Sequence, residues 1–273
     1  MKRVFVTPNI RKTPYLAIDM KRFTLFFAAA ILAAACTPKP VQLVLGTYNL
    51  HHCESEDGGR NYAQIGAVIK GLNPDVIALQ ELDSCNTRSP EFQIAELAKI
   101  SDMQYLYHRT IPFEDGSYGI GLMYKPTLEL VSSDFVVLPG EEPRGALIAE
   151  FPKFVYVSTH FCDKSAGNRN TAIYELTTYL AEKFSKSGKA VFLGGDLNSA
   201  NILEIVPIWQ QCSTDEPTFV GPEESVRIDY IVNLRSRASV EPKSSGVVSE
   251  AAGLSDHLPV VSVVEIVPAK AVR

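Results

Sequence analysis

The chain has 273 residues, of which 46% are hydrophobic and 21% charged, and its formal net charge is -5. This length suffices for one large domain with two packed layers, and we find neither an internal repeat nor a low-complexity linker. Six basic residues and one acidic residue lie within residues 1–36, which leaves 20 basic and 30 acidic residues, a net charge of -10. This balance excludes a polycationic surface for nucleic-acid backbones, so a phosphate group would have to be held by a few local groups or by a bound cation.

The first 36 residues predict a secretory leader. Lys21 and Arg22 precede an apolar run over residues 23–35, which is too short to span a bilayer and ends in small residues before Cys36. We expect Met20 to be the natural start and Cys36 to be the lipidated first residue of a bacterial lipoprotein. Plain signal cleavage is the alternative, because the position three before the cut is Ala33 rather than leucine.

The remaining chain divides into a short linker over residues 37–41, a single domain over 42–268 and a tail over 269–273. We therefore expect an exported bacterial protein, in the periplasm or anchored to the outer membrane, and a monomer. In an oxidising compartment Cys53 and Cys85 could form a disulfide, but free thiols are equally compatible with the sequence.

Apolar runs and helical periodicity give the elements in chain order. Helices are expected over residues 62–72, over 94–100 and from Arg169 to Phe184. Strands are expected over residues 41–50, 76–81, 119–124, 128–138, 146–151, 154–159, 191–196, 226–232 and 260–267. This order predicts an α/β (α+β) fold in which two packed mixed sheets are flanked by helices.

Polar residues gather at the ends of the predicted strands: Asn49, Glu81, His160, Asp196, Asn198, Asp229, Asp256 and His257. Glu81, Asn49 and Asp256 are oxygen ligands of the kind that suits Mg2+. Asp196 could orient and deprotonate a water molecule, while His257, oriented by Asp229, and His160 could stabilise charge that develops on a phosphate oxygen. No serine or cysteine stands in a nucleophile turn beside a histidine, so direct attack by water on a phosphoester follows.

Each of these residues also has a structural explanation. Glu81 and Asp229 could pair with Arg144 or Arg227, and His160 could be an ordinary strand-end histidine. The glycines Gly194 and Gly195 could let a ligand or another backbone approach, or could simply mark a turn. His51 and His52 are adjacent and would point to opposite faces of a strand, so we expect them behind the site or in solvent rather than on zinc.

Six short motifs together resemble the endonuclease/exonuclease/phosphatase superfamily, the deoxyribonuclease I-like fold. They are Thr47-Tyr48-Asn49, Gln80-Glu81, Ser158-Thr159-His160, Gly195-Asp196-Leu197-Asn198, Arg227-Ile228-Asp229-Tyr230 and Ser255-Asp256-His257-Leu258-Pro259. The resemblance implies a four-layered α/β sandwich and Mg2+-dependent hydrolysis by in-line water attack. It implies that Glu81 is the principal metal ligand, with Asn49 and Asp256 near the ion. It also implies that Asp196 and Asn198 hold water and phosphate beside the Asp229–His257 pair.

The resemblance also names substrate-side candidates. Arg144 resembles the family's substrate arginine, and Arg169 and Tyr118 complete the predicted substrate-binding set. Tyr118 stands where the deoxyribonuclease branch carries a glutamate that pairs with the strand-end histidine, so the resemblance to that branch is incomplete here.

These observations predict a nuclease-like phosphodiesterase that uses Mg2+, with Mn2+ as the alternative metal. The expected partners are a phosphoester substrate, which could be a nucleic acid, a phospholipid or a small diester, and a membrane reached through the lipid anchor. A sphingomyelinase-type or inositol-phosphate phosphoesterase is the first alternative, and a catalytically silent binding domain on the same fold is the second.

Overall fold

The structure is a computed structural model and describes residues 39–55, 58–221 and 224–269. They belong to one unit, Pro38–Arg273, whose strands form two six-stranded mixed sheets. The predicted leader, with Cys36 and Met20, lies outside the described residues. No helix in the described ranges is long and apolar enough to cross a membrane.

The first sheet has the strand order β13-β14-β1-β2-β4-β3. Its strands are β1 (Val41–Asn49), β2 (Val76–Ser84), β3 (Gln104–Phe113), β4 (Gly116–Tyr124), β13 (Ser239–Val247) and β14 (Val260–Val267). Strands β1 and β2 are parallel and are joined through the helix α2 (Tyr62–Leu72), while α3 (Gln93–Ser101) follows β2. The short helix η1 (His51–Cys53) follows β1, and η2 (Ser249–Ala251) precedes β14.

The second sheet has the strand order β5-β6-β7-β8-β12-β9. Its strands are β5 (Ser132–Leu138), β6 (Arg144–Glu150), β7 (Phe154–His160), β8 (Ala190–Asp196), β9 (Trp209–Gln211) and β12 (Asp229–Leu234). Strands β7 and β8 are the parallel pair, joined through α4 (Ala166–Phe184), and α5 (Ile202–Ile205) follows β8. A separate small ribbon pairs β10 (Phe219–Val220) with β11 (Ser225–Val226).

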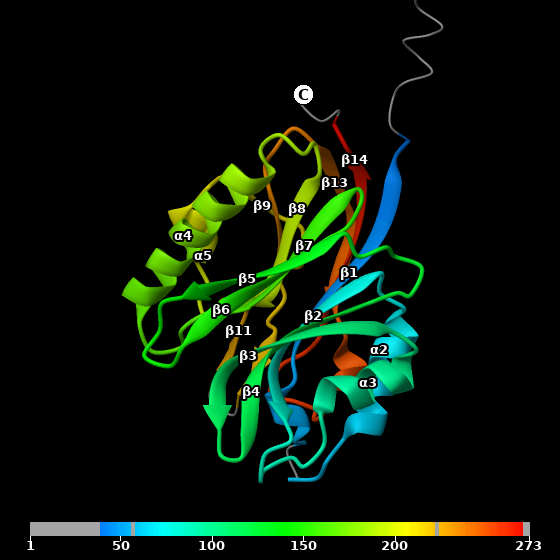
Figure 1. The fold of residues 1–273 in the computed structure, drawn as a ribbon, viewed down its shortest axis with the longest axis vertical. Helices are drawn as coiled ribbons and strands as arrows, with labels where there is room; N and C mark the ends of the chain where they lie inside the picture. Colours follow the sequence, from blue (N-terminus) through cyan, green and yellow to red (C-terminus); the bar gives the residue numbers. More distant parts are fainter. Residues whose placement is uncertain (1–38, 56–57, 222–223, 270–273) are drawn as a thin grey trace, which may run out of the picture. The chain divides into compact units, whose positions relative to one another are not determined.

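Three apolar clusters hold four layers together. One lies between the sheets and includes Leu45 and Phe192, a second packs α4 against the second sheet, and a third packs α2 and α3 against the first sheet. Figure 1 shows α4 on one side of the two sheets and α2 with α3 on the other. The predicted sandwich of two mixed sheets flanked by helices is confirmed.

The glycines Gly194 and Gly195, at the end of β8, leave space for close packing inside the protein. The Tyr156 hydroxyl crosses from the second sheet and donates a 2.7 Å hydrogen bond to the carbonyl of Gly46 in the first. A Cβ on Gly194 would stand 2.3 Å from that hydroxyl, and a Cβ on Gly195 would stand 2.2 Å from the Thr159 carbonyl oxygen. The groups that come close to these glycines are therefore the Tyr156 hydroxyl and the Thr159 carbonyl of the protein itself.

The helix expected from Arg169 begins three residues earlier, at Ala166. The Ser165 hydroxyl caps it by accepting a hydrogen bond from the Asn168 backbone amide. The helix α2 ends at residue 72 as predicted, and Asn73 adopts a left-handed conformation that closes it.

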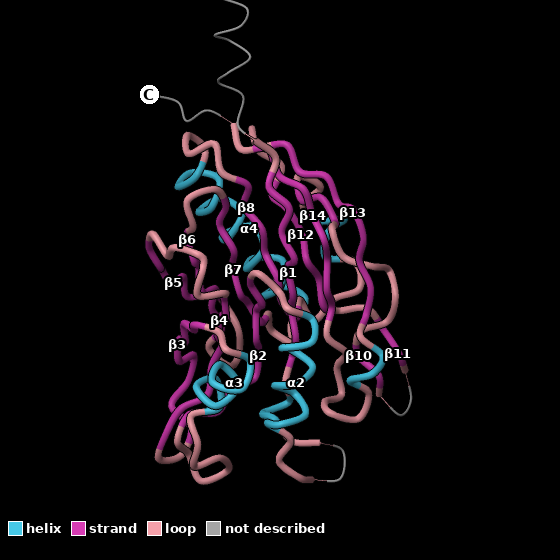
Figure 2. Tube along the Cα trace, turned by 90° about the vertical axis from the view of Figure 1, so that its right-hand side faces the viewer, coloured by secondary structure: helices cyan, strands magenta, loops and turns pink. Residues whose placement is uncertain are grey.

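Polar side chains lie together at one end of the sandwich. The described part of the chain begins and ends at the opposite end. Asn49 at the end of β1 contacts Asp196 at the end of β8. At the opposite end Val41 is in register with Ile266, and the Ala269 amide donates to the Gly188 carbonyl at 2.9 Å. Figure 2 shows β1, β8 and β14 running between these ends.

Candidate active site

Glu81 enters the site through a β-bulge in β2. The pairing with β4 shifts between Leu79 and Leu82, so Gln80 and Glu81 together oppose a single residue of β4. Glu81 adopts φ +61°, a left-handed conformation that is unfavourable for a residue with a side chain. Gln80 remains inside, where its Oε1 accepts from Thr47 on the neighbouring strand β1 and its Nε2 donates across the sheets to Ser158. The bulge thus places the Gln80 side chain in the packing and the Glu81 side chain in the site.

The Asn49 amide connects the two sheets at the centre of the site. Its Nδ2 donates to Glu81 Oε1 at 2.9 Å and to Asp196 Oδ2 at 3.1 Å. Its Oδ1 accepts from the His51 backbone amide, which fixes the orientation of the side chain. Because Glu81 belongs to the first sheet and Asp196 to the second, this amide sets the separation between their carboxylates.

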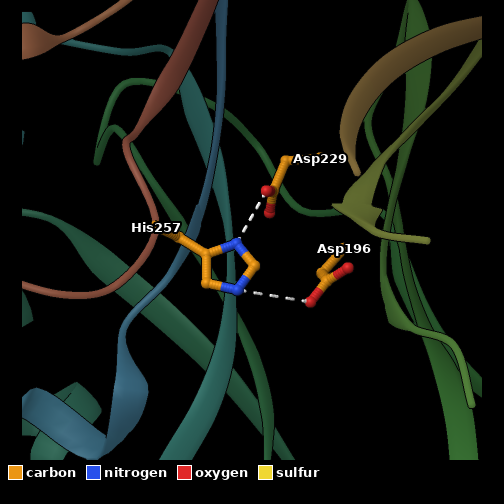
Figure 3. Close-up of side chains that lie close together, drawn as sticks. All are labelled: Asp196, Asp229 and His257. Carbon is orange, nitrogen blue, oxygen red and sulfur yellow. Dashed lines mark hydrogen bonds and ion pairs between the residues drawn. The ribbon is translucent and has the colours of Figure 1, made fainter. Parts of the chain in front are cut away.

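A buried carboxylate–histidine pair lies beside Asn49. His257 Nδ1 and Asp229 Oδ2 are 2.7 Å apart, as Figure 3 shows. Thr218 positions Asp229 by accepting its backbone N–H at the side-chain hydroxyl, while Ser255 Oγ accepts the backbone N–H of His257. Burial lowers the pKa of His257, but the charges of Asp229 and Asp196 outweigh it and raise the pKa to about 10. The ring is therefore an imidazolium at neutral pH, with Nδ1–H directed at Asp229.

Asp196 is the acceptor toward which the donors of the site converge. Its Oδ1 accepts the Asn198 backbone amide at 2.8 Å. Its Oδ2 faces His160 Nε2 at 3.5 Å and His257 Nε2 at 3.7 Å, in addition to Asn49. Full burial, and next the charge of Asp229, raise the pKa of Asp196 to about 7. A carboxylate with a raised pKa is a stronger base, so Asp196 suits the activation of a water molecule.

Arg144 determines which nitrogen of His160 carries the proton. Arg144 Nη1 lies 3.2 Å from His160 Nδ1, and a guanidinium can only donate, so Nδ1 accepts and the proton resides on Nε2. Burial, and next the charges of Arg144 and His257, lower the pKa of His160 well below its usual value. His160 is therefore a neutral donor whose N–H is aimed at Asp196 and at the space beside it.

These residues line a cavity of about 540 Å3. Its lining comprises Glu81, Tyr118, Glu142, Arg144, His160, Asp163, Asp196, Asn198, Phe219, Glu224, Val226, Ile228, Asp256 and His257. Arg144 is 8% exposed, and its Nε is buried without a hydrogen-bond partner among the described residues. The Nε–H of Arg144 is therefore an unpaired donor on a residue that lines a carboxylate-rich cavity.

The structure brings together ten of the eleven residues that were predicted for catalysis, metal binding and substrate binding. Asn49, His257 and Asp229 form the centre, and the others in the cavity lining surround them. Tyr118 is half-buried, and desolvation together with the Glu81 carboxylate raises its pKa well above the usual value, so it remains a neutral phenol. Asn198 adopts φ +49° and donates to the Phe161 carbonyl, which fixes the loop after β8.

Arg169 lies outside the cavity lining. Its guanidinium donates to the backbone carbonyls of Cys162 at 2.9 Å and Asp163 at 3.0 Å. It thus holds the loop that carries Asp163 beside Arg144. Its expected contact with substrate stays a prediction.

The ion pairs raised as structural alternatives for Glu81 and Asp229 do not form among the described residues. Arg144 pairs with Glu142 at 3.3 Å and Asp163 at 3.1 Å, and Arg227 pairs with Asp215. Neither arginine forms an ion pair with Glu81 or Asp229 among the described residues. All four of the cysteines in the described ranges are free thiols. The structure therefore does not contain the Cys53–Cys85 disulfide that the sequence allowed.

The sequence matches the model of the Endonuclease/Exonuclease/phosphatase family over residues 46–257. The chain belongs to this family. Its members are hydrolases that act on phosphoester bonds, and they are typically metal-dependent. A comparison with the curated proteins found no match.

Solved structures of the family share the fold at low sequence identity. A Bacteroides thetaiotaomicron family member superimposes with a TM-score of 0.70 at 17% identity, covering 83% of this chain and 98% of its own. The mannosyl-6-phosphatase of the same species gives 0.68 at 18% identity, covering 82% and 99%. Humanized D. rerio TDP2 gives 0.64 at 16% identity, covering 82% and 98%. These identities establish the shared fold alone.

The donor set of this family member fits a hard cation. Glu81 and Asp256 line the same carboxylate-rich cavity, and oxygen donors are the ligands that Mg2+ prefers. Asp196, Asp229 and His257 also lie within metal-ligating distance of one another. Their contact at His257 Nδ1 is a 2.7 Å hydrogen bond, however, so that nitrogen is not free for a metal. Glu81 and Asp256 would therefore hold the ion, which when bound would neutralise phosphate charge. Asn49 directs Nδ2 at Glu81 and Oδ1 at the His51 backbone amide, so its expected place beside the ion stays a prediction.

Sequence reasoning missed the acids at the rim and the residues that support the pair. Glu142, Asp163 and Glu224 line the cavity, and Thr218 orients Asp229. Glu142 lies two residues before Arg144 and Asp163 three after His160, which was the only signal in the sequence. His51 and His52 lie in the short helix η1 rather than on a strand, and His52 Nδ1 is 3.9 Å from Glu81 Oε2.

Proposed function

We propose that this chain is a metal-dependent phosphoester hydrolase in which Asp196 activates a water molecule for direct attack on phosphorus. The observation that carries the proposal is the convergence of Asn49, His160 and His257 on one buried carboxylate oxygen of Asp196. These groups have complementary roles: one base, two nitrogen donors for phosphate oxygens, and an amide that fixes the base.

The roles follow from the protonation of each group. Asp196 accepts a proton from water, because its raised pKa makes it a stronger base than an ordinary aspartate. The His257 imidazolium and the neutral His160 Nε2–H donate to non-bridging oxygens as negative charge grows. A bound Mg2+ would offset the phosphate charge. Arg144, with its free Nε–H, binds the phosphate from the far side.

The rim of the cavity favours a small phosphoester over a nucleic acid. Glu142 and Asp163 have side chains 41% and 48% exposed, so each keeps acceptor capacity beyond its contact with Arg144. Carboxylates at this position repel a polyanionic backbone and accept hydrogen bonds from hydroxyl groups. We therefore propose a small phosphoester whose leaving group carries hydroxyls, and the nuclease-like diesterase stays a prediction.

The test is hydrolysis by residues 38–273 with Mg2+, Mn2+ or EDTA. The substrates are p-nitrophenyl phosphate, its bis ester, an inositol phosphate, plasmid DNA and sphingomyelin. We expect metal-dependent turnover that is lost in Asp196→Asn and His257→Ala and kept in the matched control Asp215→Asn, which alters an exposed aspartate outside the site. Metal-independent turnover, or turnover kept in Asp196→Asn, would refute the mechanism, and no turnover by a folded protein that binds no metal would favour the silent binding domain.

A further inference from the structure

The end of the sandwich opposite the active site has a distinct surface. We call this end the entry pole, because the described chain enters there at β1 and leaves there after β14 (Figure 1). Two loops lie against the exit: the Ala269 amide donates to Gly188, and Ser236 Oγ donates to the Lys189 carbonyl. The β6–β7 turn joins them, because Lys189 Nζ donates to the Phe151 carbonyl at 2.7 Å. The entry pole therefore comprises the chain ends, the α4–β8 loop, the β12–β13 loop and the β6–β7 turn.

The entry pole carries uncompensated positive charge on a protein that is acidic as a whole. Among the described residues, no ion pair or side-chain hydrogen bond engages the exposed cations of this pole, which are Lys39, Lys153, Lys186, Arg235 and Arg237. Of the acids nearby, Glu150 pairs with Lys189 at 2.7 Å, while Glu241 and Glu265 share Lys243 at 2.8 Å and 3.5 Å, so these three acids leave one carboxylate in excess against the five cations. A net positive face thus stands where the domain joins the predicted linker.

An apolar groove of about 450 Å3 opens between the two arginines and the end of α4. Leu180, Phe184, Val191, Ile208 and Leu234 line it, and Arg235 with Arg237 form its rim. Ile208 is 42% exposed and extends the apolar lining of the groove to the surface. An apolar floor with a cationic rim is the surface that matches an anionic lipid headgroup and the acyl region below it.

We propose that the entry pole docks on a bilayer surface that contains anionic lipids. Charge complementarity carries the argument, since each basic side chain near such a surface strengthens binding roughly fivefold. The position of the chain ends supports it. Only residues 37–40 separate the predicted lipid on Cys36 from β1, a reach of roughly 17 Å, so an anchor there would bring this pole to the membrane.

The orientation has a consequence for catalysis, and this consequence rests on the proposed function. Strand β1 has 9 residues and so places Asn49 roughly 30 Å beyond the entry pole. This distance exceeds the reach of the linker, so the cavity faces water when the pole is docked. The docked enzyme would act on soluble phosphoesters and not on lipids of the bilayer that carries it.

The first test measures sedimentation of residues 38–273, which contain all three apolar clusters, with vesicles of phosphatidylcholine containing about 30% phosphatidylglycerol. We expect binding that pure phosphatidylcholine does not support and that high salt weakens. Arg235→Gln with Arg237→Gln should lower the partition coefficient roughly 30-fold. The matched control, Lys99→Gln with Arg109→Gln, removes two exposed cations from α3 and β3 and should leave binding within about twofold.

Equal binding by both double variants would overturn the proposal, as would equal binding to vesicles with and without phosphatidylglycerol. A dimer in solution that Ile208→Asn dissociates would also overturn it, because the groove would then be covered by a second copy. Sedimentation uses no substrate, so loss of hydrolysis and loss of docking are separate results. Hydrolysis of bis-p-nitrophenyl phosphate should be unchanged by vesicles, and inhibition of this reaction by vesicles would refute the orientation.

Discussion

Replacing Asp229 with asparagine tests the electrostatics of the site. The carboxylate is 1% exposed and contacts His257 Nδ1 at 2.7 Å. Together with the other nearby charges, it raises the pKa of His257 from 6.5 to about 10 against the opposing effect of burial. At about 1.4 kcal/mol per pKa unit, this rise is a preference for the charged ring on the order of 5 kcal/mol.

The Asp229→Asn variant keeps the shape of the side chain and removes the charge that is the largest raising cause. Burial of the ring remains, so we expect the pKa of His257 to fall to neutrality or below. The ring would then be neutral at pH 8, and kcat/KM should fall by about 100- to 10,000-fold, the range for a lost acid–base partner. Asp215→Asn, on the surface, should change kcat/KM by less than about twofold.

The assay is kcat/KM from pH 5 to 10, together with NMR titration of the histidine rings. We expect the wild-type ring to remain protonated through neutrality and the variant ring to titrate several pH values lower. An unchanged His257 titration, or kcat/KM within about threefold of wild type, would refute the reasoning that this carboxylate maintains the imidazolium.

Three further predictions follow from the packing and the strain described above. Gly194→Ala should lower the free energy of unfolding by about 2–4 kcal/mol, because its Cβ would meet the Tyr156 hydroxyl. In urea titrations, adding Tyr156→Phe should recover part of this loss. No recovery would show that the hydroxyl is not the obstacle. Glu81→Gly should make the metal-free protein about 1 kcal/mol more stable than Glu81→Gln, because glycine tolerates φ +61°. Both variants should lose stabilisation by Mg2+. Equal stabilities of the two variants would contradict backbone strain at this position. In EDTA, the wild-type free energy of unfolding should decrease as pH rises from 3.8 to 7, because the folded-state pKa of Asp196 lies above its unfolded value. This contribution of Asp196 to the pH dependence should be absent in Asp196→Asn. Identical pH profiles for the two proteins would refute the raised pKa.

The fold was predictable where strands are buried on both faces. The runs that became β1, β2, β7 and β8 are apolar with sharp polar ends, and α2 begins and ends at the predicted residues. Strands β3 and β13 were missed because both lie at the edge of the first sheet. Their side chains are largely exposed, and Pro112 and Pro242 interrupt them, so no apolar alternation marks them.

The site was predictable as a set of residue types but not as a geometry. The strand-end polar residues identified the chemistry, since a buried strand has little use for a terminal carboxylate. The bulge at Glu81 depends on pairing with β4, which is 37 residues away in the register Leu82↔Gly119 and leaves no local signal. Gly194 was associated with a ligand because the partner that needs the space, Tyr156, lies on another strand. The rim acid Glu142 resembles any solvated loop residue until Arg144 is placed beside it.

The order of the strands along the chain also determines when the catalytic centre can first exist during protein synthesis. The second sheet is one continuous stretch from Ser132 to Leu234, whereas the first sheet is completed only when β14 pairs with β1, the last strand with the first. His257 precedes β14 by three residues and therefore leaves the ribosome after every other residue of the site. A nascent chain can build Asp196 and Asp229 into the second sheet and still lack the histidine that joins them. Hydrolytic activity should therefore appear only once His257 and β14 have emerged, as a late folding step that depends on contacts between distant parts of the chain.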